Sequence, residues 1–333
     1  MRELNHIVPS FDFNHCVHRD GFVFTSIGEP ANVLNAIVIR NPENCDCWSP
    51  KKSYSQYSLE EHISFINKYN IEKAFIIAED IKFITRCPTL KYIEIVPADS
   101  AQENFDYSSI YKMPKLRYVS CRTQYGKCEE KSTVLDYSYI QGVTELWVRG
   151  TGHLNYDKIK RLESLYISED KCRKNLQNFA NCKSIKKLDL CQTKLTSLEG
   201  IKSFKNLESI SLAYCRCLKD ISELSSLFET LRTLSINSCS KITDFSCLEK
   251  LTNLVHLELF GNNELPDLYF INELKRLKTF TFSMHIADYD LTPCLNIPYV
   301  YSARNKKQYN LKDKDLPKTD NVNQGSIRGR FYD

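Results

Sequence analysis

The chain has 333 residues, of which 42% are hydrophobic and 26% are charged, and these values are ordinary for a folded, water-soluble protein. Its 45 basic and 41 acidic residues leave a net charge of +4, which is too balanced to indicate a nucleic-acid-binding protein. No run reaches the roughly 18 apolar residues of a membrane-spanning helix, and the first residues lack the basic and apolar regions of a secretory signal. We therefore expect a cytoplasmic protein that binds neither membranes nor nucleic acids.

The first 33 residues precede a repeating pattern that begins at Leu34. They contain short β-prone pieces, such as the run from Gly21 to Thr25, and a Gly-Glu-Pro turn at 28–30. A protein built from stacked repeats exposes an apolar edge at each end, and an irregular segment has to cover that edge. We interpret residues 1–33 as an N-terminal cap.

A helix is predicted from Leu59 to Tyr69. Its start is marked by the sequence Ser58-Leu-Glu-Glu61, which has the spacing of a capping box. The apolar residues Ile63, Phe65 and Ile66 stand on the side of this helix that we expect to face the core.

The rest of the chain repeats one phrase, in which apolar residues occupy the first, fourth and sixth positions. A first copy begins at Leu34, and ten more begin at Ile71, Leu90, Leu116, Val143, Leu162, Ile185, Leu207, Leu231, Leu254 and Leu277. The last five starts are 22, 24, 23 and 23 residues apart, whereas the earlier spacings are irregular. A fixed period of this length is typical of a repeat architecture.

Each phrase alternates apolar and variable residues, which predicts a short strand with one buried face. The segments between strands, such as Ile242 to Leu251, have an apolar spacing of three and predict 3₁₀ or short helical returns. Every unit runs in the same direction, so the strands should be parallel. A small residue follows each regular strand, where it can lie under the turn and bond backbone groups; these residues are Thr193, Cys215, Cys239 and Asn262.

These phrases resemble the leucine-rich repeat family, and residues 242–263 resemble the 22-residue class found in bacterial internalin-type proteins. The resemblance is strong over 185–285 and weak over 34–184. It implies an α/β solenoid, curved, with a parallel β-sheet on the concave side, 3₁₀ or helical returns on the convex side, and a concave face that binds another protein. The chain differs from internalins because it has no secretion signal or wall-anchoring tail.

The repeat pattern decays after Leu277. We place the solenoid at 34–285 and a C-terminal cap at 286–317, in which Tyr299 to Ser302 forms a last edge strand. Residues 318–333 are polar and without periodicity, so the sequence predicts a flexible tail there.

The concave face can be derived from the alternation, because its residues flank the buried strand positions. Aromatic residues and arginines gather on the irregular repeats, and these types dominate protein interfaces. The candidate partner-binding residues are Tyr92, Glu94, Tyr118, Arg122, Trp147, Arg149, Tyr166, Asp189, His256, Glu258 and Phe260. The alternative is that the register of the irregular repeats is shifted by one residue, which would send some of these side chains into the core.

The sequence gives little indication of metal binding or catalysis. The N-terminal residues His15, Cys16, His18, Cys45 and Cys47 are ligand types that suit zinc, but their spacing is atypical for a zinc site. The chain has no Gly-rich phosphate loop, His-Glu-x-x-His helix or nucleophile elbow, and it has only ten glycines. We therefore expect no catalytic residues, no metal and no cofactor.

The sequence favours a non-catalytic, monomeric protein-binding module, and one specific form is an immunity-type or regulatory inhibitor of a bacterial toxin or enzyme. A secreted effector that engages host proteins would share the same fold. A nucleic-acid binder is disfavoured by the acidic residues on the predicted face, and an enzyme is disfavoured by the absence of a natural cleft.

Overall fold

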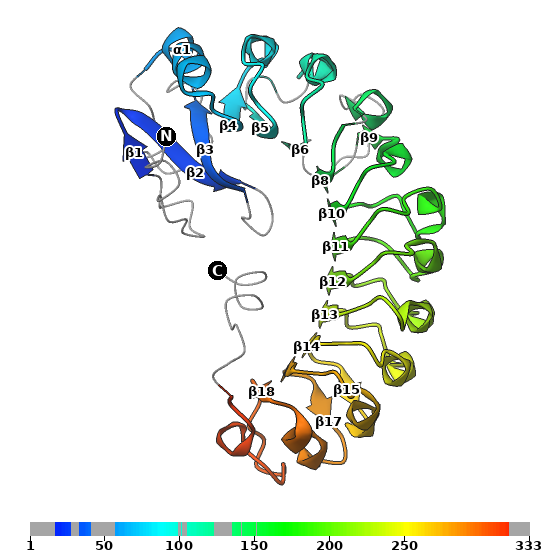
Figure 1. Ribbon diagram of the computed structural model, residues 1–333. Helices are drawn as coiled ribbons and strands as arrows, with labels where there is room; N and C mark the ends of the chain where they lie inside the picture. The colour runs from blue at the N-terminus through cyan, green and yellow to red at the C-terminus, as the bar shows by residue number, and fades with distance from the viewer. Residues whose placement is uncertain are drawn as a thin grey trace. The chain divides into compact units, whose positions relative to one another are not determined.

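The structure is a computed structural model, and it describes residues 17–27, 33–40, 57–98, 101, 105–122, 135–140, 142–150 and 152–319. The chain divides into two compact units, with the boundary between Arg161 and Leu162. Unit 1 holds the described residues up to Arg161, and unit 2 holds those from Leu162 to Thr319. In both units, strands line one side of each repeat and 3₁₀ segments line the other (Figure 1). No helix among the described residues has the length and apolar character needed to cross a membrane.

Unit 1 is built on a sheet with the strand order β1-β2-β3-β4-β5-β6-β8. A separate short parallel pair is formed by β7 and β9. The elements are β1 (Val17–Arg19), β2 (Phe22–Ile27), β3 (Val33–Arg40), α1 (Leu59–Tyr69), β4 (Lys73–Ala78), η3 (Lys82–Arg86), β5 (Tyr92–Pro97), η4 (Ser108–Lys112), β6 (Tyr118–Arg122), β7 (Leu135–Asp136), η5 (Tyr137–Tyr139), β8 (Glu145–Arg149), β9 (His153–Leu154) and η6 (Tyr156–Lys158).

The N-terminal part of unit 1 differs from the repeats because its strands are antiparallel. β1 pairs with β2 through a turn at Asp20 and Gly21, which both have positive φ, and β2 pairs with β3. From β3 onward the pairs in this sheet are parallel: β3 with β4, β4 with β5, β5 with β6, and β6 with β8. This hairpin lies within the predicted cap. Because the extent of the caps, solenoid and tail is not tested by the structure, those boundaries stay predictions.

The predicted helix is confirmed with the predicted bounds. The Ser58 hydroxyl accepts from the Glu61 amide at 3.3 Å, and the Glu61 carboxylate accepts from the Ser58 amide at 2.8 Å, which completes the capping box. Ile63 and Ile66 are buried, and Phe65 is half-buried with its ring stacked on Phe22 at 4.0 Å. The helix therefore packs through the expected face.

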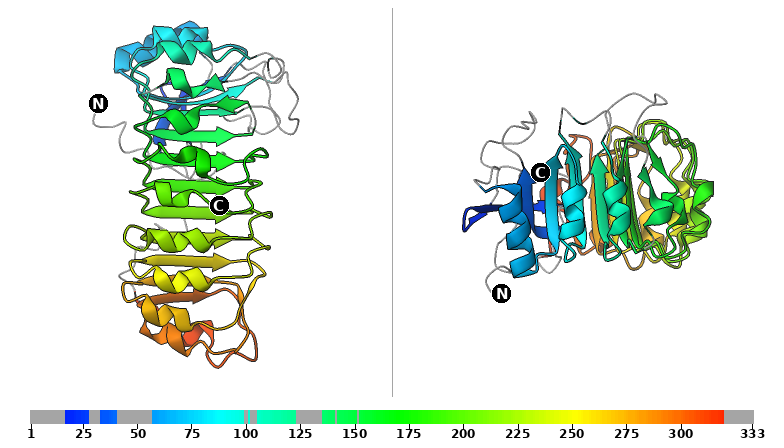
Figure 2. Two further views of the ribbon diagram at one scale, coloured as in Figure 1. Left: turned by 90° about the vertical axis from the view of Figure 1, so that its right-hand side faces the viewer. Right: turned by 90° about the horizontal axis from the view of Figure 1, so that it is seen from above.

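Unit 2 is a parallel sheet with the strand order β10-β11-β12-β13-β14-β16-β18, together with the short parallel pair β15-β17. Its strands run side by side with one 3₁₀ segment outside most of them (Figure 2). The elements are β10 (Ser164–Ser168), η7 (Gln177–Phe179), β11 (Lys187–Cys191), η8 (Ile201–Ser203), β12 (Ser209–Ala213), η9 (Ser222–Leu227), β13 (Thr233–Asn237), η10 (Ser246–Lys250), β14 (His256–Phe260), β15 (Glu264–Leu265), η11 (Tyr269–Glu273), β16 (Thr279–Phe282), β17 (His285–Ile286), η12 (Thr292–Asn296), β18 (Tyr299–Ser302) and η13 (Asp313–Asp315).

The core of unit 2 consists of apolar columns that run across the strands in register. One column joins positions that are directly paired in neighbouring strands and are at most 1% exposed: Leu165, Leu188, Ile210, Leu234, Leu257, Phe280 and Val300. Parallel repeats place the same phrase position side by side, so each apolar residue packs on its counterpart. The predicted strands and 3₁₀ returns are therefore confirmed.

The turns after the strands of unit 2 also repeat. The residue that follows each of β10, β11, β12 and β13 has φ between 53° and 59°, and its amide donates to a carbonyl oxygen of the next strand. The residue after this one is buried beneath the turn, as predicted for Thr193, Cys215 and Cys239. The thiol of Cys215 contacts the Thr193 hydroxyl at 3.2 Å, and the Cys239 thiol donates to the Leu212 carbonyl oxygen at 3.5 Å.

The prediction that Asn262 is the fourth residue beneath such a turn is wrong by one position. Asn262 is exposed, and Asn263 is the buried residue beneath the turn. The reason is one extra residue after β14. Gly261 has φ of 136°, and its amide donates to the Ser283 hydroxyl at 3.0 Å instead of to a strand carbonyl, so the turn is longer by a residue.

The C-terminal end of unit 2 is closed by a strand and a short antiparallel bridge. β18 pairs in parallel with β16, which confirms the predicted last strand. Beyond it, the Val300 amide donates to the Pro317 carbonyl oxygen at 2.9 Å, and the Thr319 amide donates to the Pro298 carbonyl oxygen at 3.1 Å. Within the predicted tail, Lys318 and Thr319 are therefore held against β18, and residues 320–333 lie outside the described residues.

Candidate partner-binding surface

The strand face is the side of each sheet that points away from the leucine core. It holds the residues between the apolar strand positions, because side chains of a strand alternate between the two faces. The pairing confirms the predicted register in the irregular repeats, since Tyr92 pairs with Tyr118, and Glu94 and Trp147 both pair with Ser120. A shift of one of these repeats by one residue against its neighbour is thereby excluded.

The exposure of this face in unit 1 is lower than predicted. Glu94, Tyr118 and Trp147 were predicted as partner-binding residues, but they are only 3, 4 and 7% exposed and are therefore not open contact residues. Tyr92 and Arg149 are half-buried. Arg122 lies in β6 and pairs with Arg149, but its side chain lies outside the described part of the chain.

A second apolar cluster explains the burial of Tyr118. On the strand face of unit 1, seven buried residues pack together and Tyr92 packs against them: Val23, Ala36, Val38, Phe75, Ile77, Val96 and Tyr118. The sheet of unit 1 is therefore apolar on both faces, which is typical of strands that are covered on both sides. In this unit the aromatic side chains contribute to a core as well as to a surface.

The strand face of unit 2 is more polar than that of unit 1, and many of its side chains are smaller. One row crosses six paired strands in register: Tyr166, Asp189, Ser211, Ser235, Glu258 and Thr281. Tyr166, Asp189, His256 and Phe260 are half-buried, as a contact surface requires. Glu258, in the same row, is only 6% exposed and is therefore a buried member of the predicted surface.

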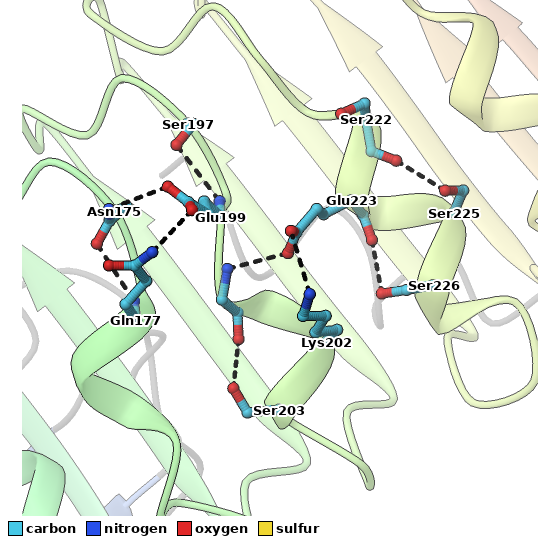
Figure 3. Close-up of polar contacts among 11 residues, drawn as sticks. Asn175, Gln177, Ser197, Glu199, Lys202, Ser203, Ser222, Glu223, Ser225 and Ser226 are labelled. Carbon is cyan, nitrogen blue, oxygen red and sulfur yellow. Dashed lines mark hydrogen bonds and ion pairs between the residues drawn. The ribbon is translucent and has the colours of Figure 1, made fainter.

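A polar network on the opposite side of unit 2 was not predicted (Figure 3). The Glu199 carboxylate accepts from the Asn175 amide at 3.2 Å and from the Gln177 amide at 2.7 Å. One repeat later, the Glu223 carboxylate accepts from the Gly200 backbone amide at 2.9 Å. Each glutamate therefore links its own turn to the turn of the preceding repeat, and a structural role accounts for these contacts.

Aspartates begin most of the 3₁₀ segments. In each case the carboxylate accepts from the amide two residues later at 2.8 to 2.9 Å, as for Asp220 with Ser222 and Asp244 with Ser246. These backbone hydrogen bonds hold the pKa values of Asp220 and Asp244 below their usual range. The repeated Asp-apolar-Ser sequence would have revealed these turns, since Asp caps the backbone two residues on.

Two exposed aromatic residues, Tyr214 and Tyr269, were not predicted from the sequence. Tyr214 is 36% exposed and directly follows β12, at the edge of the strand face. Tyr269 is 58% exposed and lies in η11, on the side of the 3₁₀ segments. An aromatic residue among small neighbours, as in the sequence Leu-Ala-Tyr-Cys at 212–215, was the available signal for Tyr214.

The described residues offer little for catalysis. The Tyr137 hydroxyl lies 3.0 Å from His153 Nδ1, but these side chains are 0 and 8% exposed and cannot meet a substrate. Burial raises the pKa of Cys87 to about 11 and that of Cys247 to about 12, so both thiols are protonated near neutral pH.

The zinc candidates His15, Cys16, Cys45 and Cys47 lie outside the described residues, as does the side chain of His18. Where the structure describes the chain, no three His, Cys, Asp or Glu side chains are grouped as metal ligands.

Residues 183–226 match a family model described as leucine-rich repeats in two copies. This stretch includes β11, η8, β12 and most of η9, which are among the regular repeats. A search of curated proteins finds no match.

Several solved structures are similar to the structure of this chain. An internalin of Listeria monocytogenes, internalin F, has a TM-score of 0.50 and 17% identity, and the match covers 76% of this chain and 73% of the internalin. Internalin C2 of the same organism has a TM-score of 0.34 and 21% identity over 51% of this chain and 66% of its own. A leucine-rich repeat protein of Leptospira interrogans has a TM-score of 0.36 and 13% identity over 75 and 82%. The first of these supports the fold, and the fold is that of leucine-rich repeat proteins.

Proposed function

We propose that this leucine-rich repeat protein is a non-catalytic module that binds a partner protein on its strand face. Leucine-rich repeat proteins generally mediate contacts between proteins, and a fixed row of side chains on a parallel sheet suits that role. The observation that carries the proposal is a set of four half-buried side chains on register-locked strands of unit 2: Tyr166, Asp189, His256 and Phe260.

Preorganisation is the physical advantage of this surface. Association normally costs free energy for ordering side chains and loops, and a rigid sheet has paid most of that cost during folding. Half-buried aromatic residues such as Tyr166 and Phe260 bring a large contact area with few rotatable bonds. Asp189 adds a charged group that selects the orientation of the partner.

For the partner we propose a bacterial toxin or enzyme, which the module would inhibit by covering its active site. A rigid binding face without chemistry of its own can act in this way by occlusion alone. The same proposal includes a cytoplasmic, monomeric protein that uses no cofactor and binds no nucleic acid.

The test begins with co-purification of the partner from the native cell, and then compares its affinity for three variants. We expect Phe260→Ala and Asp189→Ala to weaken binding of the purified partner by about tenfold or more, which corresponds to about 1.4 kcal/mol. Tyr269→Ala is the matched control, because Tyr269 is an exposed aromatic residue on the side of the 3₁₀ segments. Loss of binding in the control alone would place the contact on the opposite side and end the proposal.

A further inference from the structure

The strands of unit 2 begin side by side along one edge of the sheet (Figure 2). The residue before a strand and the first strand residue both donate their amides to one carbonyl oxygen of the preceding repeat. Glu208 and Ser209 donate in this way to the Lys186 oxygen at 2.8 and 3.0 Å. The backbone of this edge is therefore fixed by the fold. We call it the strand-start edge, and it consists of residues 183–187, 205–209, 229–233, 252–256 and 275–279.

Basic residues form two groups on the strand-start edge, and all of them are exposed. The first group lies at β11 and β12 and consists of Lys183, Lys186, Lys187 and Lys205. The second group lies at β16 and consists of Lys275, Arg276 and Lys278. In the sheet, β11 is followed by β12, β13, β14 and β16. Because neighbouring strands are about 4.8 Å apart, the backbones of the two groups are separated by up to about 19 Å.

The contacts of the folded chain do not account for these basic side chains. Within the described part of the chain, only Lys186 of the two groups forms an ion pair, with Glu163 at 3.0 Å. On the side of the 3₁₀ segments, by contrast, charged residues such as Asp220 and Asp244 accept hydrogen bonds from backbone amides. Unpaired charges of one sign repel one another and lower the stability of the folded state. A partner of opposite charge would remove this repulsion.

The pattern of charge along the edge favours a protein over a nucleic acid as this partner. Ammonium and guanidinium groups form charge-assisted hydrogen bonds with carboxylates and with phosphates. The exposed residues Glu208 and Glu229 lie between the two basic groups. A nucleic acid carries its negative charges at short, regular intervals, so some of its phosphates would face these glutamates. A protein surface can place carboxylates opposite the basic groups alone.

We infer that the strand-start edge of unit 2 binds an acidic surface of a protein, in which two clusters of Asp and Glu about 19 Å apart pair with the two basic groups. The inference rests on the proposed function, because it describes the charge of the same partner. The edge adjoins the strand face, since Lys187 is the first residue of β11 and Asp189 lies two residues further on. Charges at the rim of an interface increase the association rate and fix the orientation of the partner.

Two acidic peptides of equal charge test this arrangement without the partner. The split peptide has two runs of about four glutamates joined by about ten Gly and Ser residues, whose root-mean-square span of about 17 Å is close to the separation of the basic groups. The contiguous peptide has the same composition, with all glutamates in one run. Fluorescence anisotropy at low ionic strength should show that the natural chain binds the split peptide at least about threefold more tightly. Equal affinities, or tighter binding of the contiguous peptide, would overturn the inference.

Charge-reversal variants test whether the split peptide binds at the edge. We expect the edge variant Lys183→Glu, Lys187→Glu to bind it about tenfold more weakly, because two attractive charges become repulsive. The matched control is Lys241→Glu, Lys250→Glu, which has the same net charge and replaces exposed lysines outside the edge. The control should lose less than about threefold, since salt screens distant charges. An equal loss in both variants would show that net charge alone governs binding, and would contradict the inference.

A DNA oligonucleotide with the same charge as the peptides tests the class of partner. We expect it to bind more weakly than the split peptide, because its evenly spaced phosphates approach Glu208 and Glu229. Tighter binding of the oligonucleotide that is lost in the edge variant would assign the edge to nucleic acid and overturn the inference.

The purified partner separates this inference from the proposed function. We expect the edge variant to weaken binding of the partner by about tenfold, in addition to the effect of Phe260→Ala. A partner whose binding is weakened by Phe260→Ala and unchanged in the edge variant would support the proposed function and refute the inference.

Discussion

Asn263 Nδ2 donates to the Cys239 carbonyl oxygen at 3.1 Å, although Asn263 stands one residue later in its repeat than Cys239 does in the preceding one. The same amide group donates to the Ile242 carbonyl oxygen at 2.8 Å. One side chain thus bonds two backbone oxygens of the neighbouring repeat beneath the turn. The longer turn at Gly261 makes this position available.

Asn263→Ala should therefore destabilise the protein by about 1 to 3 kcal/mol, because two buried carbonyl oxygens lose their donor. Asn262→Ala should change the free energy of unfolding by less than about 0.5 kcal/mol, since Asn262 is exposed. Urea denaturation followed by circular dichroism measures both values. A larger loss at Asn262 than at Asn263 would contradict the assigned turn.

This pair of residues also shows how far the sequence predicts the fold. The alternation of apolar residues predicted ten repeat strands in their observed register, namely β4, β5, β6, β8, β10, β11, β12, β13, β14 and β16. The short strands β7, β9 and β15 were not predicted. The position of Asn263 could not be predicted in the same way, because a turn can lengthen by one residue without changing the pattern on either side.

The sequence predicted which side chains lie on the strand face, but it did not predict how exposed each of them is. The alternation placed Trp147 and Glu258 on the strand face correctly, but exposure depends on what packs against that face. In unit 1 this is a second apolar cluster that includes Val23 of β2, whose strand runs antiparallel to the next. A repeat pattern contains no information about an element outside the repeats, so this burial was beyond prediction.

Gly200 provides a test of how the repeats are packed. Its φ is 97°, and a Cβ atom added there would lie 2.6 Å from the backbone nitrogen of Gln177 in the preceding repeat. Gly200→Ala should lower the free energy of unfolding by about 1 to 3 kcal/mol, because the backbone would be strained and the repeats pushed apart. Thermal and urea denaturation measure this loss.

Gly142→Ala is the matched control for this substitution. Gly142 does not have a positive φ, and its added Cβ atom would approach its nearest neighbours at 3.2 Å. The control should lose less stability than Gly200→Ala. The reverse order would show that the close approach at Gly200 is relieved by a shift of the turn.

Trp147→Ala and Arg149→Ala separate a packing role from a surface role in unit 1. Trp147 is 7% exposed, so its removal should cost about 3 kcal/mol or more, as for other large buried side chains. Arg149 is half-buried at the end of β8, and its removal should cost less than about 1 kcal/mol. Chemical denaturation of the two variants gives the comparison. Unchanged stability in Trp147→Ala would return Trp147 to the role of an exposed contact residue.

His62 makes the stability of unit 1 depend on pH. Its side chain is 1% exposed, its Nδ1 lies 2.8 Å from the Ser58 carbonyl oxygen, and burial lowers its pKa below the ordinary value of 6.5. The unfolded chain therefore binds a proton at a higher pH than the folded chain does. The stability is fully present above pH 6.5 and is lost as the pH falls below 6.5 toward the pKa of the folded state, by at most about 1.4 kcal/mol per pH unit.

Urea denaturation at a series of pH values between 7.5 and 5.5 measures this effect against the variant His62→Gln. The variant carries a polar side chain that does not titrate, so its stability should fall less steeply over this range, whatever its absolute value. The relevant quantity is the difference between the two slopes, because other histidines contribute equally to both proteins. Parallel slopes would mean that His62 accepts a proton as readily in the folded chain as in the unfolded one.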